Sequence, residues 1–235
     1  MSQPTRTLRE IQVRRMFDRL SHRYDLMNGL ISFGQDLRWR RTLLKRVGLK
    51  RGARLLDVGT GTGRIPLEAL KRYQPIHVTA MDFSLRMMSR GKNGTPYQGI
   101  GWCAGDALRL PFRDASFDAV TSAYLMRNVL DPGRALEEQV RVVRPGGLVG
   151  CLETSPPDRT LVYPFVLLHL RVVIPFLGRI IAREAGAYTY LPDTTQAFMT
   201  PEKLSATMRA AGLEAVRSET FMFGVMAIHV GRRPE

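Results

Sequence analysis

A glycine-rich turn within residues 55–64 constrains the fold of this chain more than any other feature. The apolar run Leu55-Leu56-Asp57-Val58 is typical of the end of a buried parallel strand, and Gly59, Gly61 and Gly63 follow it. Glycine takes positive φ at little cost, and without a Cβ the main chain can lie against a ligand. The next helix then points its N–H groups at that ligand. The pattern predicts an α/β fold with a nucleotide-type site; a plain tight strand–helix turn is the alternative.

The glycine spacing narrows the class of ligand. A dinucleotide fingerprint, Gly-x-Gly-x-x-Gly, would place its third glycine at position 64, which is Arg64. Asp57, two residues before the first glycine, also suits a cationic ligand better than a pyrophosphate. The pattern resembles the nucleotide loop of methyltransferases that use S-adenosyl-L-methionine (SAM), and this resemblance implies SAM as cofactor.

Strands and helices alternate from residue 53 onward, which predicts one α/β domain with a mainly parallel, seven-stranded, Rossmann-like sheet. The expected parallel strands are residues 53–58, 77–82, 100–104, 117–122 and 148–152. A helix is expected over 132–143, and the last helix, 201–211, has Thr200 as its N-cap and Gly212 after it. Residues 213–220 and 223–230 are expected to form a terminal antiparallel pair.

Two further segments elaborate this core, which spans residues 49–155 and is resumed by the last helix and β-pair over 200–235. Residues 1–48 form an N-terminal helical cover: a first amphipathic helix around Val13 to Leu20, an irregular segment over 24–34 folded over a site, and a second helix over 36–47. The second elaboration is an apolar helical insertion, residues 156–199.

The insertion is apolar on nearly all sides, so it is not stable in water alone. We expect it to cover the active site, to contact a lipophilic substrate or a membrane, or to form a dimer contact. A merely buried helical pair is the alternative. Breaks at Pro164, Pro175, Gly178 and Gly186 predict short hinged segments that close as a lid. Apolar side chains such as Val173 and Phe176 are then expected to contact the substrate.

The amino-acid composition limits which cellular compartment and which binding partners we expect. The net charge of +14 favours anionic partners, namely nucleic acid, anionic lipid or an acidic substrate. Because the basic residues are scattered rather than clustered, a compositional bias is the alternative explanation. Cys103 and Cys151 are expected to be buried small hydrophobes in a reducing compartment, with no metal site. The apolar stretch 160–170 ends at Arg171, short of the about 20 residues that span a bilayer. A cytoplasmic protein, soluble or membrane-associated, is expected, because the polar, basic N-terminus is not a secretory signal.

Three acids end consecutive strands on the edge that carries the glycine turn: Asp57, Asp82 and Asp106. In a doubly wound sheet the ligand lies at this edge. Asp82 follows the glycines by about 20 residues, where a carboxylate accepts both ribose hydroxyls. Asp106, with Ala107, is expected where the adenine would lie.

The loop after the fourth strand carries Arg127-Asn128 where the methyl group would be presented. The Asn- or Asp-Pro-Pro-Tyr motif, with which nitrogen methyltransferases grip an amine or a base edge, is absent from this loop, so no nucleic-acid partner is expected. Arginine stays protonated at any ordinary pH, so Arg127 suits an anionic oxygen such as a phenolate and is a poor general base.

Five separated blocks resemble the ubiquinone/menaquinone-biosynthesis C-methyltransferases. The blocks are Tyr24-Asp25-x-Met27-Asn28 with Ser32 and Trp39, Arg127-Asn128, the run 141–147 continuing to Glu153-x-Ser155, Tyr188-x-Tyr190-Leu191, and the ending 223–231. The resemblance implies a class I methyltransferase fold acting on a polyprenylated quinol, most simply demethylmenaquinol, with Thr62, Asp82, Asp106 and Ala107 as SAM contacts. The chain departs from the family at two positions: it has Ala123 where the family usually has a serine, and Asp36 where the family usually has a histidine.

The proton acceptor stays open among His229, Tyr24, Asp25 and water. The alternatives to a quinol are another lipophilic acceptor, such as a phospholipid amine or a sterol, a nucleic-acid-binding protein with a SAM fold, and a catalytically silent SAM-binding subunit. Homo-oligomerisation is a further expectation that the sequence leaves open.

Overall fold

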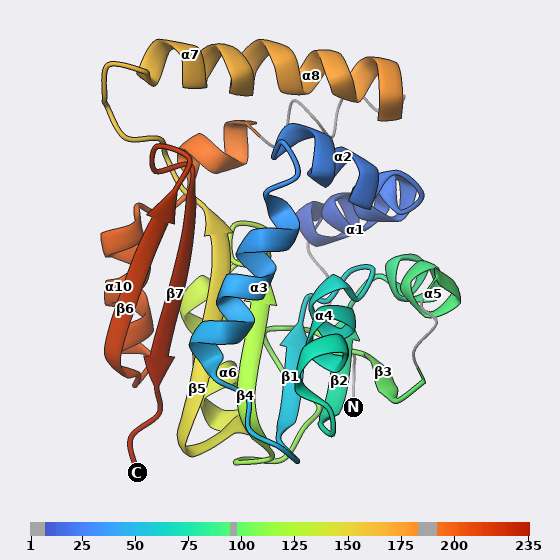
Figure 1. The fold of residues 1–235 in the computed structure, drawn as a ribbon, viewed down its shortest axis with the longest axis vertical. Helices are drawn as coiled ribbons and strands as arrows, with labels where there is room; N and C mark the ends of the chain where they lie inside the picture. The colour runs from blue at the N-terminus through green and yellow to red at the C-terminus, as the bar shows by residue number, and fades with distance from the viewer. Residues whose placement is uncertain (1–7, 95–97, 183–191) are drawn as a thin grey trace.

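The computed structural model describes residues 8–94, 98–182 and 192–235. Its centre is a seven-stranded sheet of order β3-β2-β1-β4-β5-β7-β6 (Figure 1). The strands are β1 Arg54–Val58, β2 His77–Asp82, β3 Ile100–Ala104, β4 Phe117–Ala123, β5 Val143–Thr154, β6 Glu214–Phe221 and β7 Met226–Arg232. Strands β1 to β5 are parallel, β7 is antiparallel to β5, and β6 is antiparallel to β7. The predicted fold class is confirmed.

Helices cover both faces of the sheet because its central strands are apolar on both sides. Leu55 and Leu56 of β1 are fully buried in different clusters, one with α3 Asp36–Val47 and α4 Arg64–Tyr73, the other with α6 Pro132–Val142 and α10 Pro201–Ala210. Helix α5, Leu85–Gly94, packs beside β2 and β3. The predicted N-cap is also present, since Thr200 Oγ1 accepts from the Lys203 N–H at 3.4 Å.

Two N-terminal helices lie across the carboxyl ends of the parallel strands (Figure 1). The predicted amphipathic helix is α1, Leu8–Leu20. The expectation of an irregular segment over 24–34 is wrong, because α2 is a helix over Tyr24–Ile31. Its apolar residues occupy two faces, with Met27 buried and Leu26 and Leu30 exposed, so they show no single helical period.

Within the insertion, residues 163–182 form one continuous helix, and the prediction of short hinged segments is wrong there. It runs through α7 Tyr163–Leu168, the π-helical turn η1 His169–Val173, α8 Ile174–Leu177 and the π-helical turn η2 Gly178–Ala182. Pro164 lies in the first turn, where no N–H is needed, and Pro175 is the second residue of α8, close behind the wider π turn. Gly186 and the block Tyr188-x-Tyr190-Leu191 lie outside the described residues, and a short helix over 192–197 follows them.

This long helix, defined here as residues 163–182, has two unlike faces. Leu170 and Ile174 pack into a cluster with Leu20, Met27 and Val225. Its outer face leaves large apolar side chains exposed: Phe165, Leu168, Val172, Val173, Phe176 and Ile180. The uncharged stretch ends at Arg171 as expected, but the longer segment Tyr163–Ile180, which includes Arg171 and Arg179, is long and apolar enough to cross a membrane by length and composition alone.

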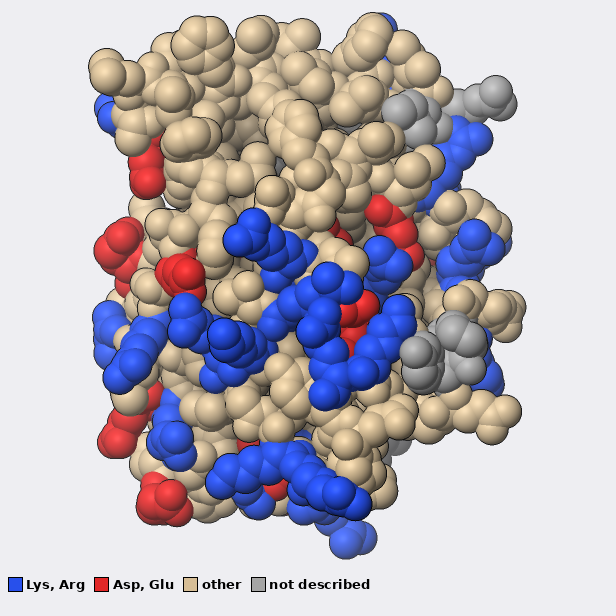
Figure 2. Space-filling view, in the orientation of Figure 1, with Lys and Arg blue, Asp and Glu red and all other residues tan. Residues whose placement is uncertain are grey.

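Charge is distributed unevenly over the face shown in Figure 2. Lysine and arginine side chains crowd its middle and lower parts, while the end formed by the long helix is almost entirely uncharged. The two cysteines also differ: Cys151 on β5 is buried as predicted, whereas Cys103 is only half-buried because β3 is an edge strand.

Candidate functional site

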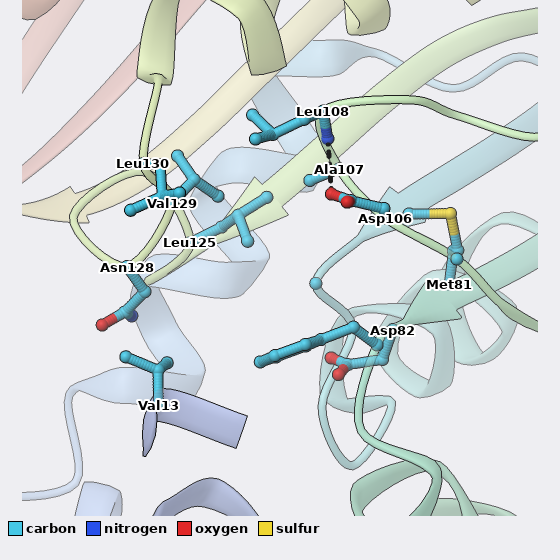
Figure 3. Close-up of a pocket in the computed structure, with 13 residues that line it drawn as sticks. Val13, Met81, Asp82, Asp106, Ala107, Leu108, Leu125, Asn128, Val129 and Leu130 are labelled. Atoms are coloured by element: carbon cyan, nitrogen blue, oxygen red, sulfur yellow. Dashed lines mark hydrogen bonds between the residues drawn. The ribbon is translucent and has the colours of Figure 1, made fainter. Parts of the chain in front are cut away.

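A cavity of about 640 Å³ opens at the carboxyl ends of β1, β2 and β3, where the sequence places the cofactor. This volume, like those of the two cavities described below, includes space that is open to solvent. Figure 3 shows Asp82 and Asp106 on one side of it, Asn128 and Leu130 on the other, and Val13 of α1 beside it. Its lining also includes Gly59 and Ala107.

Asp82 lies at the tip of β2 and organises the glycine turn. Its Oδ2 accepts the Gly61 N–H at 2.7 Å, and its Oδ1 accepts the Ser84 N–H at 2.8 Å. Burial raises the pKa of this carboxyl, and the backbone donors oppose the shift. Each carboxylate oxygen keeps a further lone pair, so the group is able to accept the two hydroxyls of a ribose while it holds the turn.

Asp106 follows β3, the next strand of the sheet after β2, and lies at the same carboxyl end. Its Oδ1 accepts the Leu108 N–H at 2.9 Å, as drawn in Figure 3, which leaves Oδ2 for a ligand. The residue is exposed within the cavity, and the backbone of Ala107 follows directly. A carboxylate in this place suits the exocyclic amine of an adenine, which is a hydrogen-bond donor.

The three loop glycines differ in role. All have positive φ: Gly59 (+68°), Gly61 (+57°) and Gly63 (+75°). A Cβ on Gly59 would lie 2.8 Å from Leu125 Cδ1 beside the cavity, whereas a Cβ on Gly63 would lie 2.6 Å from the Trp102 ring. Gly59 therefore leaves room for Leu125 in the cavity wall, and Gly63 leaves room for Trp102 behind the turn.

Asp57 and Thr62 brace the turn from two sides. Asp57 is buried under it, accepts the Thr121 hydroxyl at 2.8 Å, and has its pKa raised to about 6 by burial. It lines none of the cavities described for this site. The Thr62 hydroxyl donates to Asp25 Oδ1 at 2.8 Å, which ties α2 to the turn. Asp25, predicted as a proton acceptor, thus lies at the cofactor loop.

A second cavity, of about 410 Å³, continues the first and shares Gly59, Asp82 and Asn128 with it. Tyr24 and Tyr124 line this continuation. Burial raises the pKa of the Tyr24 phenol, while Arg40 and Arg127 oppose the shift. Tyr24 therefore lies near the cofactor end of the site, in its protonated form at neutral pH.

A third cavity, of about 1210 Å³, adjoins the second at Tyr124 and is mostly apolar. Its floor is the sheet edge with Tyr124, Arg127 and Thr154, and its roof is the long helix. The walls come from α2, α3 and the β6–β7 hairpin, and the other lining residues are Asn28, Ile31, Ser32, Phe33, Trp39, Val162, Phe165, Val166, His169, Leu170, Ile174, Thr195, Met222, Phe223, Val225 and Met226.

Arg127 is the cationic group of the floor, and its guanidinium is almost fully buried. Its Nε lies 3.0 Å from Oε1 of Glu153, a fully buried carboxylate at the end of β5. Burial raises the pKa of Glu153, and the charge of Arg127 opposes the shift. Arg127 is thus fixed in a dry setting, where a charge acts strongly on a nearby oxygen.

His229 lies apart from the other predicted site residues. It is buried on β7, its Nε2 is 3.0 Å from the Pro201 carbonyl oxygen, and burial lowers its pKa. It lines none of the three cavities. The sequence interpretation missed His169, which lines the roof and contacts the Ile31 carbonyl at 3.0 Å; a lone histidine within an apolar run was the available signal.

The described donors fit SAM. Carboxylates, backbone N–H groups and a Cβ-free cradle converge on one cleft, as an adenosine with a cationic sulfonium requires. Among the described residues, no cluster of three or more His, Cys, Asp or Glu could hold a metal ion.

Comparisons with known proteins agree over nearly the whole chain. The model of the ubiE/COQ5 methyltransferase family matches residues 5–233. The ubiquinone/menaquinone biosynthesis C-methyltransferase UbiE of Desulfotalea psychrophila is 43% identical over 219 residues, covering 93% of this chain and 89% of that protein. The demethylmenaquinone methyltransferase of Thermus thermophilus is 43% identical over 221 residues, covering 93% and 100%. That of Staphylococcus aureus is 39% identical over 222 residues, covering 94% and 92%.

Solved structures share the fold at lower identity. The [4+2]-cyclase SpnF is similar with a TM-score of 0.70 and 19% identity, over 98% of both chains. A SAM-dependent methyltransferase from Thermotoga maritima gives 0.66 and 21%, over 94% of this chain and 99% of that one. Since a cyclase is among them, the fold by itself does not specify the reaction.

Proposed function

Because this chain belongs to the ubiE/COQ5 methyltransferase family, we propose that it methylates a ring carbon of a polyprenylated quinol, with SAM as the methyl donor. Demethylmenaquinol is the first candidate acceptor, and the ubiquinone-pathway equivalent is the second. The observation that carries the proposal is the large apolar cavity, which adjoins the cofactor cleft and has the buried cation Arg127 in its floor.

Arg127 supplies what the acceptor needs. SAM provides a methyl group that is already electrophilic, so the protein must align a carbon with it and make that carbon nucleophilic. A quinol carbon becomes nucleophilic when the adjacent hydroxyl ionises. A buried guanidinium lowers the pKa of that hydroxyl and holds the phenolate in place. A quinone has no such hydroxyl, so the reduced ring is the substrate.

The positions of the candidate proton acceptors reduce their number. His229 lies outside the cavities, and the raised pKa of Tyr24 favours its protonated form. Asp25 is engaged by Thr62 at the cofactor loop. Water that enters with the quinol is therefore the acceptor we favour, with Asp25 next.

The other lipophilic acceptors fit less well. A phospholipid amine would bring a protonated nitrogen beside the cation Arg127, which is repulsive in a dry cavity. A sterol offers no ring carbon that the ionisation of an adjacent hydroxyl would activate. The cavity chemistry therefore favours a phenolic ring that carries an apolar tail.

We place this enzyme in the cytoplasm, docked on a membrane through the outer face of the long helix. Phe165, Phe176 and Ile180 are 72%, 60% and 59% exposed, and Leu161 and Phe33 extend the apolar surface near the cavity. A polyprenyl tail is delivered from lipid, and this surface adjoins the roof of the cavity that would receive it. A second copy of the chain is the competing occupant.

Mass spectrometry of the quinone pool tests the proposed function. Cells that lack this protein should accumulate a quinone one methyl group lighter than the normal product. Wild-type protein should restore the product, and the Asp82→Ala variant should not. A normal quinone pool in the deleted strain would contradict the proposal.

A further inference from the structure

Tyr124 is the residue at which the methyl-donor end of the cleft and the apolar cavity meet, since it lines both. It directly follows β4, and its φ is +57°, in the left-handed region that a bulky side chain rarely adopts. Such a conformation is strained, and it persists where the surrounding structure over-determines it. The contacts of Tyr124 show what holds it.

Both ends of Tyr124 are fixed by hydrogen bonds. Its N–H donates to the Leu152 carbonyl at 2.8 Å, and its own carbonyl accepts from Asn128 Nδ2 at 2.7 Å. At the far end, the phenol hydroxyl donates to Asp36 Oδ1 at 2.7 Å. The ring is therefore held between the carboxyl ends of β4 and β5 and the first turn of α3.

Asp36 is a strong anchor because it is itself held. Its two oxygens lie 3.1 and 3.0 Å from Arg40 Nε, and both side chains are buried. Burial by itself would raise the pKa of Asp36, but the charge and hydrogen bond of Arg40 outweigh it and lower the pKa. Tyr124 thus donates to an ionised carboxylate, a charge-assisted bond roughly twice as strong as a neutral one.

The Tyr124 ring also lies beside the cation that would hold the acceptor. Cζ of Arg127 is 5.7 Å from the ring centroid, and Cζ of Arg40 is 5.2 Å from it. Cations at these distances are attracted to the ring. The position of the ring is therefore coupled to that of Arg127.

We propose that the Tyr124 ring, anchored by Asp36, forms the wall between the second and the third cavity, here called the partition, and that this wall aligns the acceptor ring with the methyl donor. Asp36 is then a positioning residue that acts through Tyr124. This inference rests on the proposed function for the nature of the acceptor. Arg127 holds the acceptor oxygen, and the Tyr124 ring limits the angle at which the neighbouring carbon faces the cofactor cleft. Holding the reacting atoms in line contributes much of the rate enhancement in enzymes, so a Tyr124 ring that is no longer anchored lowers the rate of the chemical step.

Tyr124→Phe tests the partition, because it keeps the ring and removes only the bond to Asp36. We expect kcat to fall about tenfold, while KM for the quinol and Kd for SAM stay within about twofold of wild type. Tyr73→Phe, on α4 and away from the three cavities, is the matched control and should change none of these values. Unchanged kcat in Tyr124→Phe would overturn the proposal, and so would a kcat loss matched by an equal loss of quinol binding.

A double-mutant cycle with Asp36→Asn tests the anchor. If Asp36 acts through Tyr124, adding Tyr124→Phe to Asp36→Asn should lower kcat by less than about twofold more. Full additivity of the two losses would overturn the positioning role of Asp36. Should Asp36→Asn fail to fold, since it leaves Arg40 unpaired, Tyr124→Phe alone decides, because it leaves the ion pair intact. Turnover of the quinol by wild type tests the proposed function, whereas the ratio of variant to wild type tests the partition, so the two fail separately.

Discussion

The hydroxyl of Thr62 donates a 2.8 Å hydrogen bond to Asp25, and this bond joins the N-terminal cover to the glycine turn. Thr62 belongs to the turn after β1, whereas Asp25 lies in the first turn of α2. The N-terminal helices are thereby coupled to the loop that would hold the cofactor. Binding of SAM and ordering of α2 over the site should then support each other.

Removing this bond should weaken SAM binding. We expect Asp25→Ala to raise the Kd for SAM about fivefold to tenfold, which corresponds to about 1 kcal/mol, the typical net contribution of one hydrogen bond. Thr62→Val removes the same bond from the other side and should have a similar effect. Calorimetry measures both, and an unchanged Kd in both variants would show that the bond does not support the site.

Asp82→Asn should cost far more SAM affinity, because Asp82 organises the turn and would accept the ribose hydroxyls. Loss of these charge-assisted bonds corresponds to about 3 kcal/mol, or roughly a hundredfold in Kd. Asp106→Asn is the matched control: it lies in the same cavity, and its side chain accepts one backbone N–H that an amide oxygen can also accept, so a smaller loss is expected. A folded Asp82→Asn protein with wild-type affinity would refute the assignment.

Asp57 should make the protein less stable as the pH rises. Burial raises its pKa to about 6 in the folded state, above the value in an unfolded chain. The folded protein therefore binds this proton more tightly, and the stabilisation present below about pH 4 is lost as the pH rises through about 6. Asp57→Asn cannot titrate and should escape this loss.

Urea unfolding at about pH 4.5 and about pH 7.5 measures the effect. Relative to wild type, the unfolding free energy of Asp57→Asn should improve by about 2 kcal/mol between the two pH values. Comparison with wild type at each pH cancels other titrating groups, such as Asp36 and Glu68, whose lowered pKa values act in the opposite direction. The same difference at both pH values would mean that Asp57 titrates normally.

The outer face of the long helix should bind vesicles without anionic lipid. The basic side chains visible in Figure 2 lie mostly away from this face, so the contact should be hydrophobic and only weakly sensitive to salt. Phe176→Asp with Ile180→Asp should abolish sedimentation with neutral vesicles while the protein stays folded. Binding that needs anionic lipid and disappears in salt would instead assign the contact to the net charge of +14.

Ile174→Ala is the inner-face control, because Ile174 is 3% exposed and packs into the cluster beneath the helix. It should lower the unfolding free energy by about 2–4 kcal/mol and leave vesicle binding of the folded protein unchanged. Loss of vesicle binding in this variant as well would show that helix integrity, rather than the outer face, was measured.

The sheet was predictable from the sequence because its signals are local. The run Leu55-Leu56, the glycines and the cap Thr200 each specify their own neighbourhood, and five parallel strands then follow from the strand–helix rhythm. The helices that cover the site, in the N-terminal segment and in the insertion, were harder to predict. The apolar residues of α2 face both the core and solvent, and Pro175 signals a break that the π-helical turn before it absorbs.

The site was predictable where it follows from strand ends and less so where it depends on packing. Asp82, Asp106 and Arg127 lie at the expected edge. The anchor at Asp36 joins α3 to the loop after β4, and no local pattern reveals a contact between residues 88 positions apart. The departure at Asp36 was visible, but its partner Tyr124 was not.

The central claim is tested most directly by methyl transfer to a defined acceptor. Purified protein, SAM and demethylmenaquinol in neutral vesicles are incubated under reducing conditions, and the product is analysed by mass spectrometry and NMR. We predict one new methyl group on a ring carbon, no product from the oxidised quinone, and a strong loss of kcat in Arg127→Gln. A protein that binds SAM but leaves the quinol unmethylated, or that methylates quinone and quinol equally, would contradict the account.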